Sequence, residues 1–176
     1  MLRKLMAVLL LAAMMFAGAA WADQAEEILV DGGYVLTEDL EIEYGEYYYT
    51  PEEVSLYLHV FCCLPENYIT KDEARELGWD SWAGNLWKVA EGMCIGGDQF
   101  GNREGLLPKK KGRTWYECDV NYSGGRRDKE RLLYSNDGLI YYTGDHYQSY
   151  ELLYEGWYVD ENGDVYGEVW ADANAD

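Results

Sequence analysis

The chain has 176 residues, with 33 acidic side chains against 14 Lys and Arg, and a formal net charge of −19. It contains 17 Tyr and 7 Trp but 3 Pro, a composition that suits a compact fold with many aromatic packing groups. No apolar run approaches the roughly 20 residues of a comfortable membrane span, which argues against a bilayer-spanning helix. The sequence also lacks repeats of the solenoid type.

The first 22 residues have the three parts of a secretory signal. Arg3 and Lys4 precede the apolar stretch Leu5–Phe16, and Ala20-Trp21-Ala22 is a small-x-small cleavage site. An uncleaved anchor is the alternative. Because an anchor needs a longer apolar run, we expect a signal peptide cleaved near Ala22 and a secreted protein with no membrane segment. The 154 residues that remain fit one domain with its own core.

Acidic side chains cluster at both ends of this mature chain. Residues 23–49 hold nine carboxylates and residues 154–176 hold seven, and neither segment contains Lys or Arg. The remaining basic residues all lie within residues 50–153. We therefore divide the chain into an acidic N-terminal extension (23–49), a central domain (50–153) and an acidic C-terminal extension (154–176). Solubility is the ordinary role of such extensions.

The N-terminal extension reads as two short strands, ILV and YVL, joined by the turn DGG. Thr50-Pro51-Glu52-Glu53 then predicts a helix start, with a Thr cap, Pro at the first helical position and Glu at the third. Apolar residues follow at helical spacing, and His59 lies one step off this stripe, which predicts an exposed residue. A second capping box at Thr70–Glu73 predicts a helix that stops by Gly78, and a short third helix is expected over Leu86–Ala90.

Strand-like runs follow Gly92: CIGGDQF, RTWYECDV, RLLYS, LIYYT and YQSYELL. The sequence Ser135-Asn136-Asp137-Gly138 predicts a hairpin turn between two of them. Helices first and consecutive strands later predict an α+β fold, with N-terminal helices packed on a mostly antiparallel β-sheet. In the C-terminal extension, Asp160–Asp164 contains Asn-Gly and predicts a hairpin. A calcium loop is the alternative, but Val165 stands where such a loop needs Gly.

Few residues suit metal or cofactor chemistry. The chain has two histidines, and His146 lies in the turn before the last strand-like run. No second His lies nearby and no Cys pair has zinc-finger spacing, so we expect no metal site and no other cofactor. The sequence also lacks Gly-rich nucleotide-binding motifs and the Gly-x-Ser-x-Gly nucleophile motif.

The basic residues form two groups. An exposed loop explains Lys109-Lys110-Lys111 without a function. In the second group, strand alternation would point Arg127, Lys129 and Arg131 to one face. Three cations on one face need anions, either carboxylates or phosphates, and Glu117 in a Trp- and Tyr-rich strand is a candidate partner. A structural salt bridge and a functional site are both compatible with this pattern.

Four long segments of the middle of the chain carry a family resemblance: LPENYITKDEARELGW, GNLWKVAEGMCIGGDQFGNREGLLP, GRTWYECDVNY and ERLLYSNDGLIYYTGDHYQSYELLY. From about Thr50 to Leu153 the chain resembles the barnase-like bacterial guanyl-specific ribonucleases almost without gaps. The resemblance implies the microbial ribonuclease fold, here with acidic hairpin-like flanks. It also implies a secreted endoribonuclease that cuts RNA 3′ of guanosine without a metal.

The resemblance further implies roles for five residues. Glu117 matches the general base that takes the proton of the ribose 2′-hydroxyl, and His146 matches the general acid that protonates the departing 5′-oxygen. The product is a 2′,3′-cyclic phosphate, which is then hydrolysed. A carboxylate and an imidazole suit these two proton transfers near neutral pH. Lys71, Arg127 and Arg131 match phosphate-binding positions, where cations stabilise the developing charge.

Base preference is implied to come from the loop Phe100–Glu104. In the family, backbone amides of this loop contact guanine O6, and a carboxylate matching Glu104 accepts hydrogen bonds from N1 and N2. Tyr147 matches an aromatic contact beside the acid. The substrate-binding residues that the resemblance implies are Phe100, Gly101, Asn102, Arg103, Glu104 and Tyr147.

The sequence departs from the family at several positions. Gly101 stands where Ser is common, and Cys62 stands at the helix end that usually holds His. All four cysteines are additions relative to barnase. Four thiols in an exported protein allow three pairings, and we expect Cys94 and Cys118, on neighbouring strands, to form a disulfide.

The implied partners are RNA and an intracellular barstar-like inhibitor, and we expect a monomer. The alternative function is a catalytically weak RNA- or partner-binding protein on the same fold. The acidic extensions suggest a further hypothesis, in which a C-terminal hairpin folds near the basic cleft and competes with RNA phosphates.

Overall fold

The computed structural model describes residues 28–168. The expected signal peptide and the last eight residues of the C-terminal extension therefore lie outside the described residues. Within residues 28–168, no helix is both long and apolar enough to cross a bilayer.

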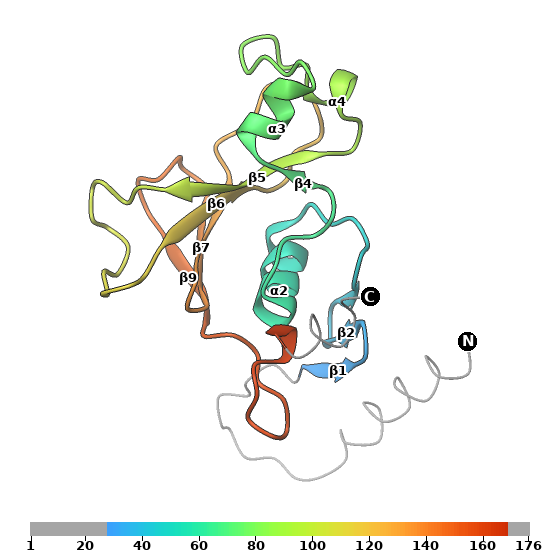
Figure 1. Cartoon of the computed structure of the whole chain (residues 1–176), viewed down its shortest axis with the longest axis vertical. Coiled ribbons are helices and arrows are strands. Elements are labelled where there is room, and N and C mark those ends of the chain that lie inside the picture. Colours follow the sequence, from blue (N-terminus) through green and yellow to red (C-terminus); the bar gives the residue numbers. More distant parts are fainter. Residues whose placement is uncertain (1–27, 169–176) are drawn as a thin grey trace, which may run out of the picture.

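A six-stranded sheet and three helices form the central part of the molecule (Figure 1). The strands lie in the order β4-β5-β6-β7-β8-β9; β4 runs parallel to β5 and every other pair is antiparallel. This arrangement confirms the predicted α+β fold with a mostly antiparallel sheet. The bounds are α2 Pro51–Phe61, β4 Tyr68–Ile69, α3 Lys71–Glu76, α4 Leu86–Val89, β5 Cys94–Phe100, β6 Trp115–Asp119, β7 Arg131–Ser135, β8 Leu139–Thr143 and β9 Glu151–Glu155.

Both predicted capping boxes are present. The Thr50 side chain accepts a hydrogen bond from the Glu53 amide, and the Glu53 carboxylate accepts from the Thr50 amide, so α2 begins at Pro51. Thr70 and Glu73 make the same reciprocal bonds at α3. These local bonds fix the first residue of each helix, which places Lys71 at the N-terminus of α3.

Alternation along β6 sends Cys118 to the face of the sheet that packs on α2 and Glu117 to the opposite face. Cys118 and the following Val120 pack with Val54 and Leu58 of α2. Since successive strand residues point to opposite faces, Glu117 and Asp119 project from the face of the sheet that α2 does not cover. Helix α2 therefore covers one face with apolar contacts, while the other face carries both the charged side chains and a smaller apolar cluster around Trp115 and Leu133.

The N-terminal extension forms a small antiparallel sheet on the other side of α2 (Figure 1). It consists of β1 (Leu29–Asp31), β2 (Tyr34–Leu36) and β3 (Glu41–Glu43). Two of the strands were expected from the sequence, and β3 was not. Val35 and Ile42 pair across β2 and β3 and are completely buried against Leu56, Tyr57, Val60 and Phe61 of α2.

The C-terminal extension also packs on α2. Val159 bridges to Val165 across the turn at Asp160–Asp164, in agreement with the predicted hairpin turn, and the Tyr158 amide donates to the His59 carbonyl. Tyr158 and Tyr166 pack against the cluster that joins α2 to the small sheet. Helix α2 is therefore covered on two sides, which buries all but its outermost side chains.

The hypothesis that the C-terminal hairpin covers the basic cleft is wrong for the described residues. The hairpin and the small sheet lie against α2, whereas Glu117 and Asp119 project from the opposite face of the main sheet. The physical reason is that their apolar and aromatic residues need a dry surface, and the outer face of α2 supplies it.

Two expectations about individual residues are also corrected. His59 is partly buried rather than exposed, since its ring stacks on Tyr154 at 4.3 Å and its Nδ1 donates to the Gly156 carbonyl at 2.9 Å. Cys94 and Cys118 do lie on neighbouring strands, but both are free thiols. The residue paired with Cys118 is Gly96, so the two cysteines are diagonal neighbours, a separation of roughly 7–8 Å that is too wide for a disulfide.

The environment of His59 predicts a pH dependence of stability. Burial lowers the pKa of His59 from 6.5, and the hydrogen bond to Gly156 opposes this shift without reversing it. The unfolded chain therefore binds the proton more readily, so the free energy of unfolding should decrease as the pH falls below about 6.5. Urea unfolding between pH 7.5 and 5 should show a smaller decrease for His59→Phe, which can stack on Tyr154 but cannot titrate. Parallel curves for the two proteins would contradict this account.

Candidate active site

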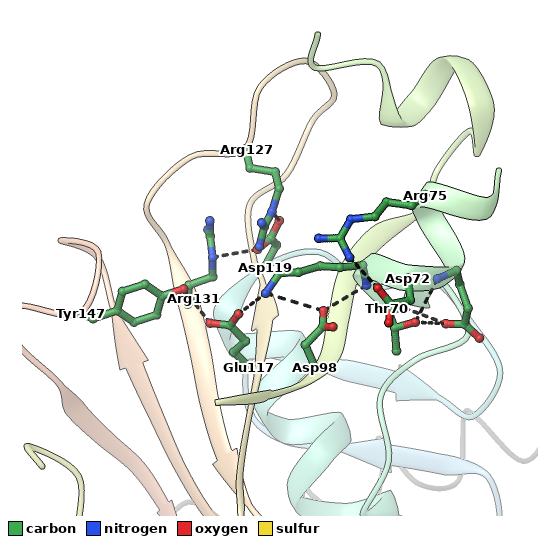
Figure 2. Close-up of polar contacts among 11 residues, drawn as sticks. Thr70, Asp72, Arg75, Asp98, Glu117, Asp119, Arg127, Arg131 and Tyr147 are labelled. Carbon is green, nitrogen blue, oxygen red and sulfur yellow. Dashed lines mark hydrogen bonds and ion pairs between the residues drawn. The ribbon is translucent and has the colours of Figure 1, made fainter. Parts of the chain in front are cut away.

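Charged side chains from four parts of the chain converge on the face of the main sheet that α2 leaves open (Figure 2). Glu117 comes from the centre of β6, Lys71 from the start of α3 and Arg131 from the start of β7. Arg127 comes from the loop before β7 and Tyr147 from the loop between β8 and β9. The structure thus brings together five of the residues that the sequence singled out.

The Glu117 carboxylate lies at the centre of this cluster and is 8% exposed. Lys71 Nζ donates to Glu117 Oε1 at 2.5 Å, and the Tyr147 hydroxyl donates to Oε2 at 2.6 Å. Burial by itself would raise the pKa of Glu117. The hydrogen bonds from Lys71 and Tyr147 and the charges of Lys71 and Arg127 outweigh it, so the pKa is lowered from 4.5. Glu117 is therefore ionised at neutral pH and able to accept a proton.

The two arginines are held by Asp119 rather than by Glu117. Arg127 makes a bidentate contact, with Nε to Oδ2 at 2.5 Å and Nη2 to Oδ1 at 2.6 Å. Arg131 lies directly opposite Asp119 on β7, with Nε 2.8 Å from Oδ1 at an angle unsuited to a hydrogen bond, so the attraction is between charges. The expectation that Glu117 neutralises the arginines is wrong, because the carboxylate two residues further along β6 is closer to both.

Asp98 is a second carboxylate that the sequence analysis did not single out. It accepts a hydrogen bond from the Lys71 amide at 3.1 Å and lies 3.8 Å from Lys71 Nζ. A bulge in β5, with Gly97 at a φ of 88°, shifts the register so that Asp98 pairs with Glu117. Positive φ favours glycine here. Asp98 thus anchors the first turn of α3 and orients Lys71 toward Glu117.

A signal for Asp119 was present in the sequence. It occupies the alternate position to Glu117 in YECDV and so shares its face. For Asp98 no such signal existed, since a regular strand without the bulge would give a different register.

His146 lies in a tightly held loop beside this cluster. Asp145 accepts hydrogen bonds from the Gln148 and Ser149 amides, and the Tyr147 amide donates to the Thr143 hydroxyl. His146 and Tyr147 both have positive φ, 63° and 71°, an uncommon conformation for residues other than glycine. The His146 ring is exposed and tilted against the Tyr147 ring at 4.7 Å. The loop therefore presents an accessible imidazole next to the tyrosine that contacts Glu117.

The loop predicted to recognise a base lines a pocket of about 580 Å³ together with His146 and Tyr147. The Phe100 ring stacks on Tyr147 at 5.3 Å and closes one side. Both polar atoms of the Asn102 side chain bond the backbone of Leu107, so this side chain shapes the loop rather than facing a ligand. Glu104 is exposed. The residues that line the pocket are Gln99, Phe100, Gly101, Asn102, Arg103, Glu104, His146 and Tyr147.

Two other basic residues, Lys129 and Lys110, lie away from this cluster. Lys129 is exposed in the loop before β7 and does not join Arg127 and Arg131. Lys110 pairs with Asp137 at the β7–β8 turn at 3.1 Å. Among residues 28–168, no group of three His, Cys, Asp or Glu side chains could hold a metal ion.

The arrangement can move protons around a bound anion. The ionised Glu117 carboxylate accepts a hydrogen bond from Tyr147, whose ring contacts the exposed His146, and Lys71, Arg127 and Arg131 add positive charge to this cluster. Fixed cations of this kind stabilise negative charge that develops on a phosphoryl group. The pocket lined by the Phe100–Glu104 loop, His146 and Tyr147 adjoins them.

Comparison with known proteins identifies the family. A model described as ribonuclease matches residues 52–154. A ribonuclease of Heyndrickxia coagulans is 54% identical over 104 residues, which are 59% of this chain and 95% of that protein. A ribonuclease of Bacillus intermedius is also 54% identical over 104 residues, 64% of its length. The guanyl-specific ribonuclease St of Saccharopolyspora erythraea is 39% identical over 57 residues, 32% of this chain and 56% of that protein. The chain belongs to the microbial ribonuclease family.

Proposed function

We propose that the protein is a secreted, metal-independent endoribonuclease that cleaves RNA 3′ of guanosine. The observation that carries the proposal is the buried, ionised Glu117 among Lys71, Arg127 and Arg131, beside an exposed His146. The family match supports ribonuclease activity, and the similarity to a guanyl-specific ribonuclease supports the base preference.

The first step is an internal transesterification. Glu117 takes the proton of the ribose 2′-hydroxyl, whose oxygen attacks the adjacent phosphorus. The bond from phosphorus to the 5′-oxygen breaks, and a protonated His146 gives its proton to that leaving oxygen. The products are a 2′,3′-cyclic phosphate and a free 5′-hydroxyl. Each proton transfer contributes on the order of 10²–10⁴-fold to the rate.

The second step is hydrolysis with the two roles exchanged. Neutral His146 takes a proton from water, the water oxygen attacks phosphorus, and the bond to the 2′-oxygen breaks. Glu117, now protonated, returns its proton to the 2′-oxygen and leaves a 3′-phosphate. Both residues are thus restored to their starting states.

The cations supply the charge that the reaction needs. Negative charge gathers on the non-bridging phosphoryl oxygens, and Lys71, Arg127 and Arg131 lie beside the carboxylate that starts the attack. Because Asp98 and Asp119 hold these side chains before RNA arrives, little reorganisation is required. The proposed chemistry therefore requires no metal ion.

The base preference is assigned to the Phe100–Glu104 loop. Exposed Glu104 can accept hydrogen bonds from guanine N1 and N2, and backbone amides of the loop can donate to O6. Adenine carries a donor where guanine has O6 and lacks the two donors that face Glu104. By analogy with groove readout, each good bidentate contact is worth roughly 1–3 kcal/mol of discrimination.

The proposal also covers export and partners. Export rests on residues 1–22, and the N-terminal sequence of protein recovered from culture medium should begin near Asp23; retention of Met1 would contradict it. We propose a monomer, with an intracellular inhibitor of the barstar type that presents carboxylates to Lys71, Arg127 and Arg131 and so protects the producing cell.

A single-guanosine assay tests the catalytic proposal. A fluorogenic oligonucleotide with one guanosine should be cleaved in excess EDTA at an unchanged rate. Glu117→Ala and His146→Ala should each lower kcat/KM by about 10²–10⁴-fold, because each removes one proton transfer. Glu151→Ala, which alters an exposed carboxylate of β9, serves as the control.

Three results would count against the proposal. Activity that disappears with EDTA would indicate a metal enzyme. Activity that survives the double change Glu117→Ala with His146→Ala would remove the assigned pair. Equal rates on a matched adenosine substrate would remove the guanine preference.

The bond from Tyr147 to Glu117 predicts a shift in the pH profile. This bond helps to lower the pKa of Glu117 from 4.5, so the acid limb of kcat/KM should lie below pH 4.5 in the wild type. In Tyr147→Phe the pKa should rise, and the acid limb should move to higher pH. Tyr150→Phe is the matched control, since Tyr150 lies on the same loop without a hydrogen bond to Glu117 in the structure. Coincident acid limbs for Tyr147→Phe and wild type would show that the bond does not tune the base.

A further inference from the structure

Trp82 is the most exposed large apolar side chain of residues 28–168, with 80% of its surface accessible. The other large apolar residues of this part of the chain range up to 57%. An exposed indole lacks the hydrophobic stabilisation that burial would provide. Such a side chain is well suited to stack on a flat ligand, because its whole π-face is available.

The loop that carries Trp82 is fixed by local hydrogen bonds. The Gly84 amide donates to the Asp80 carbonyl at 3.1 Å, and the Trp82 amide donates to the Asp80 carboxylate at 2.8 Å. The Asn85 side chain accepts from the Asp80 amide and donates to the Gly78 carbonyl. Trp82 therefore lies at the apex of a closed turn between α3 and α4, and its backbone is ordered before any ligand binds.

This turn packs against the loop that leads to the catalytic arginine. A Cβ on Gly84 would lie 2.8 Å from the Arg126 amide nitrogen, so the two backbones are in direct contact there. Trp87 of α4 packs closely on Gly124 of the same loop. The Trp87 ring also makes an edge-to-face contact with the Tyr122 ring, with 5.5 Å between the ring centroids. Arg127 lies over the Trp79 ring at 5.9 Å. The Trp82 turn and the Arg127 loop thus form one packed unit beside the active site.

Arg126 supplies a cation to this unit. Its side chain is exposed, and no ion pair or hydrogen bond to a side chain occupies it in the described part of the chain. Its neighbour Arg127, by contrast, is held by Asp119. An exposed guanidinium and an exposed indole, carried by two loops whose backbones are in contact, match the two chemical parts of a nucleotide, the phosphate and the base.

We propose that Trp82 and Arg126 form an accessory subsite for an RNA nucleotide beyond the guanosine that is cleaved. The base of that nucleotide stacks on the Trp82 indole, and its phosphate contacts the Arg126 guanidinium. The proposed guanine pocket includes Tyr147, which bonds Glu117, whereas the Trp82 turn packs on the loop that carries Arg127. We therefore place the bound strand across the cation cluster between them. The proposal rests on the proposed ribonuclease function. It predicts that Trp82 and Arg126 raise kcat/KM for longer substrates but not for dinucleotides.

Substrate length provides the test. We compare kcat/KM on a guanosine dinucleotide with kcat/KM on two oligonucleotides, one extended by two nucleotides on the 5′ side and one on the 3′ side. For one of them, the ratio of extended to dinucleotide kcat/KM should fall about 5- to 100-fold in Trp82→Ala. Trp82→Phe should restore most of it. Leu77→Ala, which removes an exposed apolar side chain next to the same turn, should leave the ratio as in wild type.

The salt dependence tests Arg126 separately. In Arg126→Gln, the slope of log(kcat/KM) against log salt for that extended substrate should be reduced by about one relative to wild type. An unchanged slope would exclude a phosphate contact at Arg126.

The outcomes distinguish this subsite from the catalytic proposal. If Trp82→Ala changes kcat/KM equally for all three substrates, the subsite is excluded while the ribonuclease function stands. If the wild type cleaves no substrate, the proposed function fails. Binding of an uncleavable oligonucleotide with 2′-deoxyguanosine then decides the subsite: affinity lost in Trp82→Ala supports it, and equal affinity overturns it.

Discussion

The ion pairs of Asp119 are the interaction on which the rest of the active face depends. This carboxylate is 1% exposed and binds Arg127 and Arg131, of which Arg131 is itself 4% exposed. Removing one partner of such a buried cluster leaves uncompensated charge, a loss of about 3–5 kcal/mol. Because Asp119 satisfies the arginines, Glu117 two residues away is left to Lys71 and Tyr147. Two carboxylates on one strand thus separate the placement of the arginines from the proton transfer proposed for Glu117.

The apolar layer on the opposite face of the same strands supplies hydrophobic stabilisation that offsets the cost of burying this polar cluster. Cys118, Val120, Leu132 and Ile140 pack on α2 as an apolar layer, so the buried charges of Asp119 and Arg131 stay outside the contact between the sheet and α2. The matched family region ends at residue 154, and the small sheet and C-terminal turn lie outside it. These additions bury the outer face of α2 around Tyr57 and Phe61. They extend the hydrophobic core of the family fold without touching the catalytic face.

The net charge of the chain is opposite in sign to the cations that lie on its active face. The chain carries a formal charge of −19, yet Lys71, Arg127 and Arg131 gather on its active face, where the proposed polyanionic substrate binds. Screening at physiological salt acts over about 8 Å, so the distant carboxylates of β1–β3 influence RNA less than the adjacent cations do. Placing the acidic strands behind α2 separates the two signs of charge. Solubility and phosphate binding can then coexist in one domain.

The sequence by itself determined the α+β class and the capped starts of α2 and α3, and it singled out five of the residues that converge on the active face. Capping boxes and strand alternation are local rules, so they could be read without the fold. The family resemblance supplied the roles proposed for Glu117 and His146, which local patterns could not assign. Only the tertiary structure decided that Asp119 neutralises the arginines, that a bulge at Gly97 places Asp98 beside Lys71, and that the acidic extensions cover α2. Each of these depends on register or packing between segments distant in sequence, where several partners were equally compatible with the local pattern. The same limit applies to Trp82, because exposure at the apex of a turn becomes visible only when the surrounding loops are packed.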